Sequence, residues 1–271
     1  MPELPEVETV KNTLKKLVLN KKIVKADVIY PKIIEFPDVE KFKKEIKNQT
    51  ITDIKRRGKW LMFELNDYYL LSHLRMEGKY EIRRVKDAVE KHEHVSFRFS
   101  DDTELRYKDT RKFGRMHLIK KEDIYSQKPL NELGLEPWDK ELTTTYLKEK
   151  FKNKSTTIKT VLLDQSIIVG IGNIYDDEIL FLSKINPLRK ANTLTDKELE
   201  DIIKYTKITL EKAIKLGGTT IRTYTSSEGV HGRFQNELLV HNQKKCPTCK
   251  ENLEKIKIGG RSTYYCNKCQ E

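Results

Sequence analysis

The sequence has 271 residues and carries 53 lysines and arginines against 41 aspartates and glutamates, which gives a formal net charge of +12. This length suggests about two domains, and the charge favours a polyanionic partner such as nucleic acid. Proteins that cross a membrane with apolar helices are excluded as a class, because no apolar run approaches the roughly 18 residues that cross a bilayer. The N-terminus also lacks the features of a secretory signal, so we expect a cytoplasmic protein.

The chain begins Met1-Pro2-Glu3-Leu4-Pro5-Glu6. A proline in second position allows the initiator methionine to be removed, which would expose a secondary amine. The pKa of a free α-amino group lies well below that of a lysine, so this amine would be a nucleophile near neutral pH and would form an iminium with an aldehyde carbon. Glu3 could move protons beside it. Alternatively, the prolines and acids simply begin a helix.

Apolar residues from Leu4 to Leu17 recur at helical spacing, which predicts an amphipathic helix over residues 3–18 that would hold the terminal amine in place. Eight β-prone runs follow, and their spacing predicts a sandwich or barrel. They are Ile23–Ile29, Thr50–Ile54, Trp60–Leu65, Tyr69–Leu74, Tyr80–Arg84, His94–Phe99, Glu104–Lys108 and Arg115–Ile119. Residues 37–47 should form a small covering helix.

Several turns between these runs carry candidate binding residues. Gly58 permits a turn from which the amine of Lys59 would project, and such a basic turn suits a phosphate. Met76 and Phe113 have the shape to fill the space left when a nucleotide leaves the base stack, although ordinary core packing is the alternative. His92 and His94 could be read as a metal pair, but no nearby cysteine or further histidine completes such a site.

A loop signal around residues 128–137 places a domain boundary near residue 135. Helical patterns follow over residues 143–151, 156–163, 175–182 and 196–216. Before the third, Gly170-Ile171-Gly172-Asn173 could bind phosphate through helix-start amides and the Asn173 side chain, and we expect Lys154 and Lys159 to add positive charge nearby. Residues 217–229 are polar and glycine-rich, so they should form a mobile loop.

All four cysteines lie near the C-terminus, paired as Cys246-x-x-Cys249 and Cys266-x-x-Cys269. Two such pairs match a tetrahedral four-thiolate zinc site. Residues 256–265 between them predict a β-hairpin that turns at Gly259-Gly260. The metal would therefore be one structural Zn²⁺ that stiffens the hairpin, and Arg261 beside the turn could reach a phosphate.

Taken in order, these motifs resemble those of bacterial formamidopyrimidine-DNA glycosylases, which remove oxidised purines from DNA. The resemblance rests on residues 1–9, Arg57-Gly58-Lys59, His73-Leu74-Arg75-Met76-Glu77-Gly78, Arg111-Lys112-Phe113-Gly114, Gly170-Ile171-Gly172-Asn173-Ile174-Tyr175 and the four cysteines. It implies an α+β fold with an N-terminal β-sandwich and flanking helices, a helical helix-two-turn-helix domain and a β-hairpin zinc finger. The implied domains are residues 1–134 (catalytic), 135–240 (DNA-binding, with a lesion-recognition loop) and 241–271 (zinc finger).

The resemblance also implies a bifunctional glycosylase and AP lyase of base excision repair that acts on 8-oxoguanine and formamidopyrimidines in double-stranded DNA. Pro2 would attack C1′ of the sugar while Glu3 assists proton transfer, and β- and δ-elimination would cut the strand. Lys59 would donate a proton, and Arg261 would contact phosphate and take part in elimination. The implied DNA contacts are His92 and the wedge of Met76, Phe113 and Arg111, together with Lys154 and Asn173. We expect a nucleoid-associated monomer.

Two alternatives remain. Endonuclease VIII, the sister family, shares the Pro-Glu start but prefers oxidised pyrimidines; Leu4 and the wedge of Met76, Arg111 and Phe113 speak against it. The family pattern around that wedge commonly has proline and arginine where this chain has Thr110 and Lys112. A non-catalytic nucleic-acid-binding zinc protein would explain the charge and the cysteines, but not Pro2, Glu3 and Lys59 together.

Overall fold

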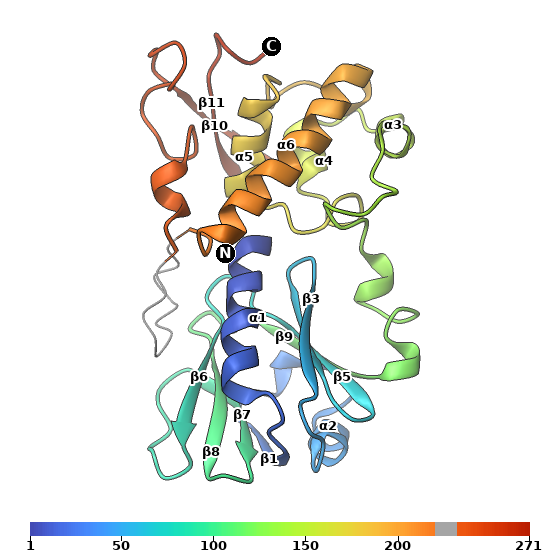
Figure 1. The fold of residues 1–271 in the computed structure, drawn as a ribbon, viewed down its shortest axis with the longest axis vertical. Helices are drawn as coiled ribbons and strands as arrows, with labels where there is room; N and C mark the ends of the chain where they lie inside the picture. Colours follow the sequence, from blue (N-terminus) through green and yellow to red (C-terminus); the bar gives the residue numbers. More distant parts are fainter. Residues whose placement is uncertain (220–231) are drawn as a thin grey trace. The chain divides into compact units, whose positions relative to one another are not determined.

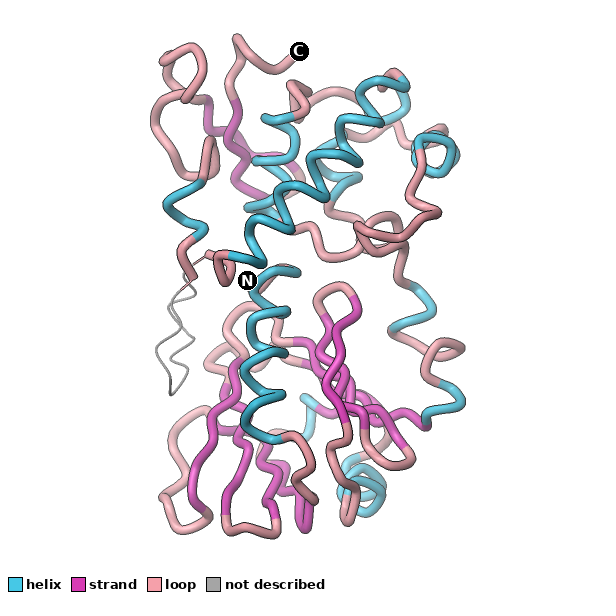
Figure 2. The backbone as a smooth tube through the Cα atoms, viewed as in Figure 1, coloured by secondary structure: helices cyan, strands magenta, loops and turns pink. Residues whose placement is uncertain are grey.

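The computed structural model describes residues 1–219 and 232–271, and its contacts divide the chain into two compact units. The first unit contains Met1–Pro2 and Glu6–Asn131; the second contains Glu3–Pro5, Glu132–Thr219 and Gly232–Glu271. Strands dominate the first unit, and helices dominate the second apart from a C-terminal hairpin (Figures 1 and 2). The expected α+β class is confirmed. Most of the predicted lesion-recognition loop lies outside the described residues.

The first unit contains two sheets. One has the order β1-β7-β8-β6, formed by Ile23–Val28, Glu93–Phe99, Thr103–Lys108 and Lys79–Arg84. The other has the order β2-β9-β5-β4-β3, formed by Ile34–Phe36, Arg115–Lys120, Tyr68–His73, Trp60–Glu64 and Asp53–Arg57. Seven of the eight predicted runs coincide closely with strands, whereas the run Thr50–Ile54 overlaps β3 only at Asp53 and Ile54. The sequence did not predict β2, a three-residue strand that pairs in parallel with β9.

Alternating side chains of these strands build the core of the first unit. On β7, Val95, Phe97 and Phe99 are buried at every second position, as expected for a strand with one face on a core. Helix α1 (Leu4–Val18) buries Val7, Val10, Leu14 and Val18 against the same cluster. Helix α2 (Val39–Ile46) adds Phe42 and Ile46 and is capped by Asp38, which accepts from the backbone N–H of Lys41.

The second unit contains α3 (Thr144–Phe151), α4 (Ile158–Leu162), α5 (Asn173–Leu182), α6 (Asp196–Lys215) and the hairpin of β10 (Glu254–Ile258) and β11 (Arg261–Tyr265). Thr143, Thr157 and Thr195 cap three of the helices through their side chains. Short 3₁₀ turns at Pro31–Ile33, Lys121–Asp123, Leu130–Glu132, Ala191–Thr193 and Phe234–Glu237 complete the described secondary structure.

Helix α6 is the longest described helix, and it packs in the core through Leu199, Ile202, Leu210 and Ala213, which are buried, while Ile208 is exposed. Among residues 1–219 and 232–271, no helix has the length and apolar composition needed to cross a membrane.

Candidate functional site

The carboxylate of Glu3 is held at the N-terminus of α5. Its Oε1 accepts a hydrogen bond from the backbone N–H of Ile174 at 2.9 Å, and its Oε2 accepts from that of Tyr175 at 3.4 Å. Helix α5 begins after Gly172, which offers no capping side chain, so Glu3 satisfies two of the unpaired amides at this end. The positive end of the helix dipole favours the ionised carboxylate. Glu3 is therefore buried, at 2 % exposure, in one defined orientation.

Gly170 and Gly172 make room for the N-terminal segment. A Cβ atom on Gly172 would lie 2.3 Å from Cδ of Glu3, and one on Gly170 would lie 2.3 Å from Cδ1 of Leu4. The backbone N–H of Leu4 also donates to the carbonyl of Gly170 at 3.1 Å. The expectation that the helix-start amides are available to a phosphate is therefore wrong for Ile174 and Tyr175, because Glu3 occupies them.

Asn173, the first residue of α5, joins this helix to the C-terminal hairpin. Its Nδ2 donates to the carbonyl of Ser262 at 2.8 Å. Its Oδ1 is buried and has no hydrogen-bond partner within the described part of the chain. A DNA contact by Asn173 stays a prediction.

Asp109 organises the loop that carries Arg111 and Phe113. Its fully buried carboxylate accepts hydrogen bonds from the backbone N–H groups of Arg111, Phe113 and Gly114 at 3.0, 2.9 and 2.8 Å. The Arg111 guanidinium lies 4.7 Å from the centre of the Phe113 ring, and that ring is 45 % exposed. Core packing is thereby excluded for Phe113. Sequence reasoning missed Asp109, although an aspartate that binds backbone groups two residues on is a known turn signal.

The loop that carries Met76 packs against the same support. A Cβ atom on Gly78 would lie 2.2 Å from the hydroxyl of Tyr107, and one on Gly114 would lie 1.8 Å from it. The Met76 loop and the Phe113 loop therefore both approach the buried Tyr107, whose hydroxyl donates to Asp109 at 3.3 Å. Met76 itself is half-buried. Met76 and Phe113, the two apolar candidates for the wedge, therefore lie on loops that pack against the same buried residue, Tyr107.

Lys59 follows Gly58, whose φ of +55° allows the tight turn between β3 and β4. Lys59 is buried, at 6 % exposure, rather than projecting openly from the tip of the turn as expected. On the neighbouring strand, His73 accepts from the backbone N–H of Arg75 at 3.0 Å. Burial, and to a smaller degree the charges of Arg75 and Lys59, lower the pKa of His73 to about 3, so this ring is neutral near pH 7. Sequence reasoning singled out its motif but not His73 itself.

His92 and His94 support the Asp109 loop. The backbone N–H of Asp109 donates to the carbonyl of His92 at 3.0 Å, and Nε2 of His94 lies 2.9 Å from the carbonyl oxygen of Asp109. No group of potential metal ligands among the described residues includes a histidine. A contact of His92 with the DNA backbone stays a prediction.

The basic candidates of the second unit differ in their exposure. Lys159 is completely buried, with its Nζ 2.6 Å from Oδ1 of Asp177. The expectation that Lys159 adds positive charge for a phosphate near residues 170–173 is therefore wrong, because its ammonium is buried against acids. The side chain of Lys154 is 43 % exposed and lies 3.5 Å from Asp164. Arg261 is exposed directly after the turn at Gly259 and Gly260, whose φ values of +53° and +77° confirm the predicted hairpin.

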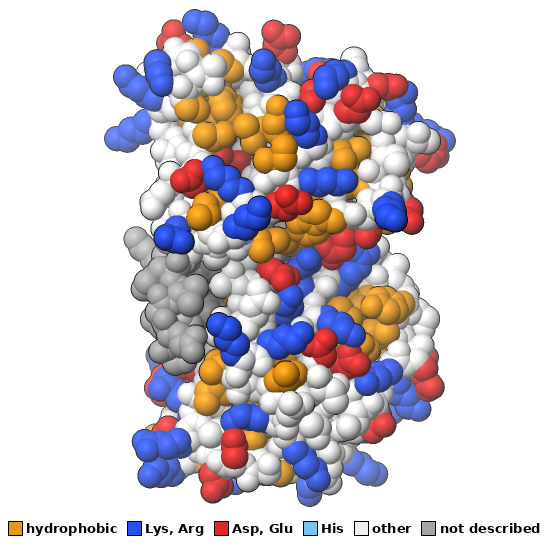
Figure 3. Space-filling view, in the orientation of Figure 1, with side chains coloured by type: hydrophobic (Ala, Val, Ile, Leu, Met, Phe, Trp, Pro, Cys, Tyr) orange, Lys and Arg blue, Asp and Glu red, His pale blue; other side chains and the backbone are white. Residues whose placement is uncertain are grey.

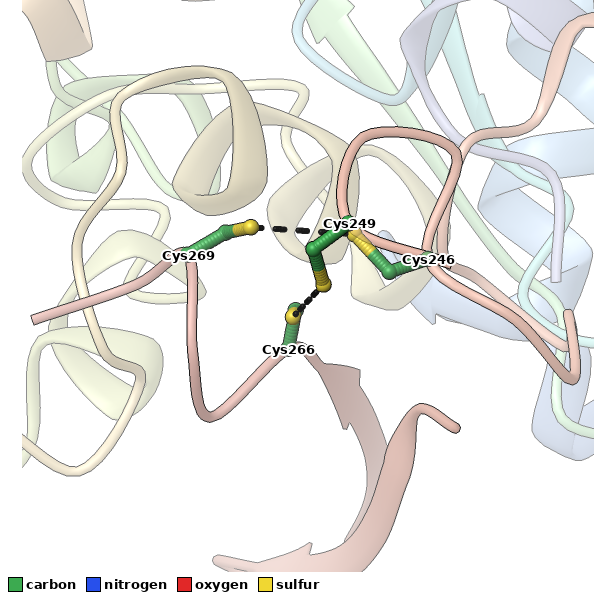
Figure 4. A group of neighbouring side chains, drawn as sticks. All are labelled: Cys246, Cys249, Cys266 and Cys269. Carbon is green, nitrogen blue, oxygen red and sulfur yellow. Dashed lines mark hydrogen bonds between the residues drawn. The ribbon is translucent and has the colours of Figure 1, made fainter. Parts of the chain in front are cut away.

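The four cysteines converge as predicted for a zinc site (Figure 4). The sulfurs of Cys249 and Cys266 are 3.5 Å apart, those of Cys246 and Cys269 are 3.9 Å apart, and all four lie within 4.8 Å of one another. Thiolates bound tetrahedrally at about 2.3 Å from zinc would be about 3.8 Å apart. These separations are too long for a disulfide of about 2.05 Å. The cysteines therefore hold one structural Zn²⁺.

Comparison with known proteins agrees with this geometry. Residues 1–116 match the formamidopyrimidine-DNA glycosylase N-terminal domain, residues 133–225 its H2TH domain, and residues 243–271 the zinc finger found in FPG and IleRS. The chain is 52 % identical over 273 aligned residues to a formamidopyrimidine-DNA glycosylase of Bacillus cereus, and 49 % identical to one of Oceanobacillus iheyensis. These alignments cover all of this chain and 99 % and 98 % of the two relatives.

Solved structures give the same relationship. The complex between Lactococcus lactis Fpg and DNA containing an abasic site matches with a TM-score of 0.92 at 40 % identity, covering 99 % of both chains. Lactococcus lactis Fpg bound to DNA containing N7-benzyl-Fapy-dG matches equally well, over the full length of both chains. The chain belongs to the formamidopyrimidine-DNA glycosylase family.

Proposed function

We propose that this protein is a bifunctional DNA glycosylase and AP lyase that removes 8-oxoguanine and formamidopyrimidines from duplex DNA. The observation that carries the proposal is the Glu3 carboxylate, fixed by the amides of Ile174 and Tyr175 and covalently next to Pro2. Removal of Met1 would leave a secondary amine beside a positioned proton acceptor. That pair supplies the nucleophile and the acid–base group that base excision needs.

The reaction follows from these groups. The Pro2 nitrogen attacks C1′ of the damaged nucleotide as the bond from C1′ to the base breaks, and Glu3 passes the proton lost by the amine. The C1′–O4′ bond then opens, with a proton going to O4′, to give an iminium between Pro2 and C1′. The resulting iminium makes the neighbouring sugar positions more acidic, so that successive β- and δ-eliminations break the strand. We assign Lys59 as a proton donor in these steps, and Arg261 to a phosphate beside the lesion and a part in the later elimination.

The loops of the first unit support a wedge. Exposed Phe113 and half-buried Met76 have the apolar surface to replace a nucleotide that leaves the stack, and Arg111 would face the orphaned cytosine. Thr110 and Lys112, the departures from the family pattern, leave these three residues in place. His92, Lys154 and Asn173 would contact the DNA backbone, whose phosphates supply a large share of the affinity of protein–DNA complexes.

The proposed domain roles, oligomeric state and location rest on membership of the formamidopyrimidine-DNA glycosylase family. Figure 3 shows many lysine and arginine side chains at the surface. Solved structures contain Lactococcus lactis Fpg bound to DNA with an abasic site or with N7-benzyl-Fapy-dG. Another contains MutM bound to DNA with carbocyclic 8-oxo-G. We assign residues 1–134 to catalysis, 135–240 to DNA binding with the lesion-recognition loop, and 241–271 to the zinc finger. We further propose a monomer that works in the cytoplasm at the nucleoid.

Lesion preference tests this function. Duplexes containing 8-oxoguanine opposite cytosine should be cut much faster than duplexes containing thymine glycol, with an undamaged duplex as the control. Faster cleavage of thymine glycol would instead favour the endonuclease VIII-like activity. Binding of duplex DNA without cleavage of either lesion would favour the non-catalytic zinc protein.

A further inference from the structure

Three consecutive acids on α5, Asp176, Asp177 and Glu178, are almost completely buried, at 0 %, 1 % and 1 % exposure. Both carboxylate oxygens of Glu178 have hydrogen-bond partners, because they accept from the backbone N–H groups of residues 239, 240 and 241 at 2.8, 3.0 and 2.8 Å. Asp177 accepts from Lys159 at 2.6 Å and lies 2.6 Å from Nδ1 of His241. These two acids have the partners that buried carboxylates require.

Asp176 lacks such partners. Neither of its carboxylate oxygens has a hydrogen-bond partner among the described residues. The nearest cation is Lys159, whose Nζ lies 3.4 Å from Oδ2 of Asp176 but 2.6 Å from Asp177. One ammonium therefore faces two buried carboxylates and is closer to Asp177. An ionised carboxylate without hydrogen bonds in such a place is strongly disfavoured.

Asp176 also lies beside the candidate active site. It occupies the first turn of α5, and its backbone N–H donates to Gly172 at 2.9 Å, directly beside the amides that hold Glu3. The charged groups that act on it are Lys159 from α4, Asp177 from α5 and Glu3 from the N-terminal segment. Burial, together with the charges of Asp177 and Glu3, raises the pKa of Asp176 against the opposing effect of Lys159, and the net pKa is about 8. His241 and Glu178 reach the cluster through Asp177 and residues 239–241.

We propose that Asp176 is a positioning residue that carries a proton at neutral pH and thereby protects the charge state of Glu3. The protonated acid leaves Lys159 to Asp177 and adds no second negative charge near the Glu3 carboxylate. Its ionisation would raise the proton affinity of Glu3 and of the adjacent Pro2 amine. This inference rests on the proposed function, because it matters to catalysis only if Pro2 and Glu3 carry out base excision.

Carbon-13 NMR of the side-chain carboxyl groups tests the proton directly and does not depend on activity. In the full-length zinc-loaded protein, the Asp176 carboxyl carbon should titrate near pH 8, and the Glu3 carboxyl carbon should shift at the same pH. The Glu3 shift should vanish in Asp176→Asn and persist in Glu200→Gln, which alters an exposed acid on α6. Titration of Asp176 below pH 6, or a Glu3 shift that survives in Asp176→Asn, would overturn the proposal. If Asp176→Asn folds poorly, the wild-type titration still shows whether Asp176 holds a proton at neutral pH and whether the Glu3 carboxyl responds at the same pH.

Single-turnover excision of 8-oxoguanine supplies the catalytic readout. Wild type and Asp176→Asn should react at similar rates at pH 6.5, because asparagine resembles the protonated acid. As Asp176 ionises near and above pH 8, the wild type should react more slowly than the variant, by up to about threefold if the pKa of the reacting amine rises by about half a unit. Parallel pH profiles would contradict the coupling to Glu3. Absence of excision in both proteins at every pH would count against the proposed function, while the NMR titration would still decide whether Asp176 holds the proton.

Discussion

Glu3 shows how one side chain serves both structure and chemistry. It caps α5 in place of the missing side chain at Gly172, and it also lies next to the candidate nucleophile. Glu3→Gln keeps an acceptor oxygen for one helix amide but cannot accept a proton. We expect this variant to bind lesion duplex within a few-fold of wild type and to lose base excision by at least about 100-fold, the usual range for an acid–base group. Equal single-turnover excision rates in Glu3→Gln and wild type would rule out this role.

At the scale of the structural element, Asp109 determines the shape of the wedge loop. Asp109→Ala leaves three backbone N–H groups without their acceptor, and each buried unsatisfied donor costs about 1–3 kcal/mol. We expect a lower free energy of unfolding and weaker binding to lesion duplex, measured by denaturant titration and fluorescence anisotropy. Glu122→Ala, which removes an exposed acid from the same unit, is the control. Unchanged affinity in Asp109→Ala would mean that the ordered loop is not needed for binding.

The zinc-bound hairpin of β10 and β11 is a second element, and its loss should affect DNA binding rather than the helical core. It is tied to α5 through Asn173 and Ser262, and through Asp177 and the backbone of Tyr264, while the helices of the second unit have their own core. Chelation of zinc, or Cys249→Ser, should therefore displace Arg261 and abolish DNA binding at temperatures where the helical circular dichroism signal is retained. Affinity that survives complete zinc removal would exclude the hairpin from the binding surface.

Sequence patterns predicted most elements, because their determinants are local. Apolar residues at helical spacing locate the helices, β-prone runs locate most strands, and the Cys-x-x-Cys pairs locate the zinc site. Strand β2 was missed since its three residues are defined by pairing with β9. The burial of Lys159 was also missed, because it depends on acids from α5 that the fold brings beside it. The occupied amides at Ile174 and Tyr175 likewise depend on a contact with Glu3, far away in the sequence.

At the scale of the whole molecule, Asp176 should leave a signature in the pH dependence of stability. Its pKa is raised to about 8 in the folded protein and is about 3.9 in an unfolded chain, so the folded state binds more protons between these values. The contribution of Asp176 to stability is therefore lost as the pH rises from about 4 to about 8, by up to ~1.4 kcal/mol per pH unit. Asp176→Asn should lack this slope, while Glu200→Gln should keep it. If the free energy of unfolding, measured with denaturant, changed with pH equally in wild type and in Asp176→Asn between pH 5 and 8, Asp176 would already be ionised in the folded protein.

Trapping with borohydride tests the central claim, that the amine of Pro2 is the nucleophile. An amine that attacks C1′ passes through an iminium, which borohydride reduces to a stable amine. Protein lacking Met1, incubated with an 8-oxoguanine duplex and borohydride, should form a covalent protein–DNA adduct that peptide mass spectrometry locates at Pro2. Protein that retains Met1 should form none, because the Pro2 nitrogen is then part of an amide. An adduct at Lys59, or full trapping with Met1 still attached, would contradict the account.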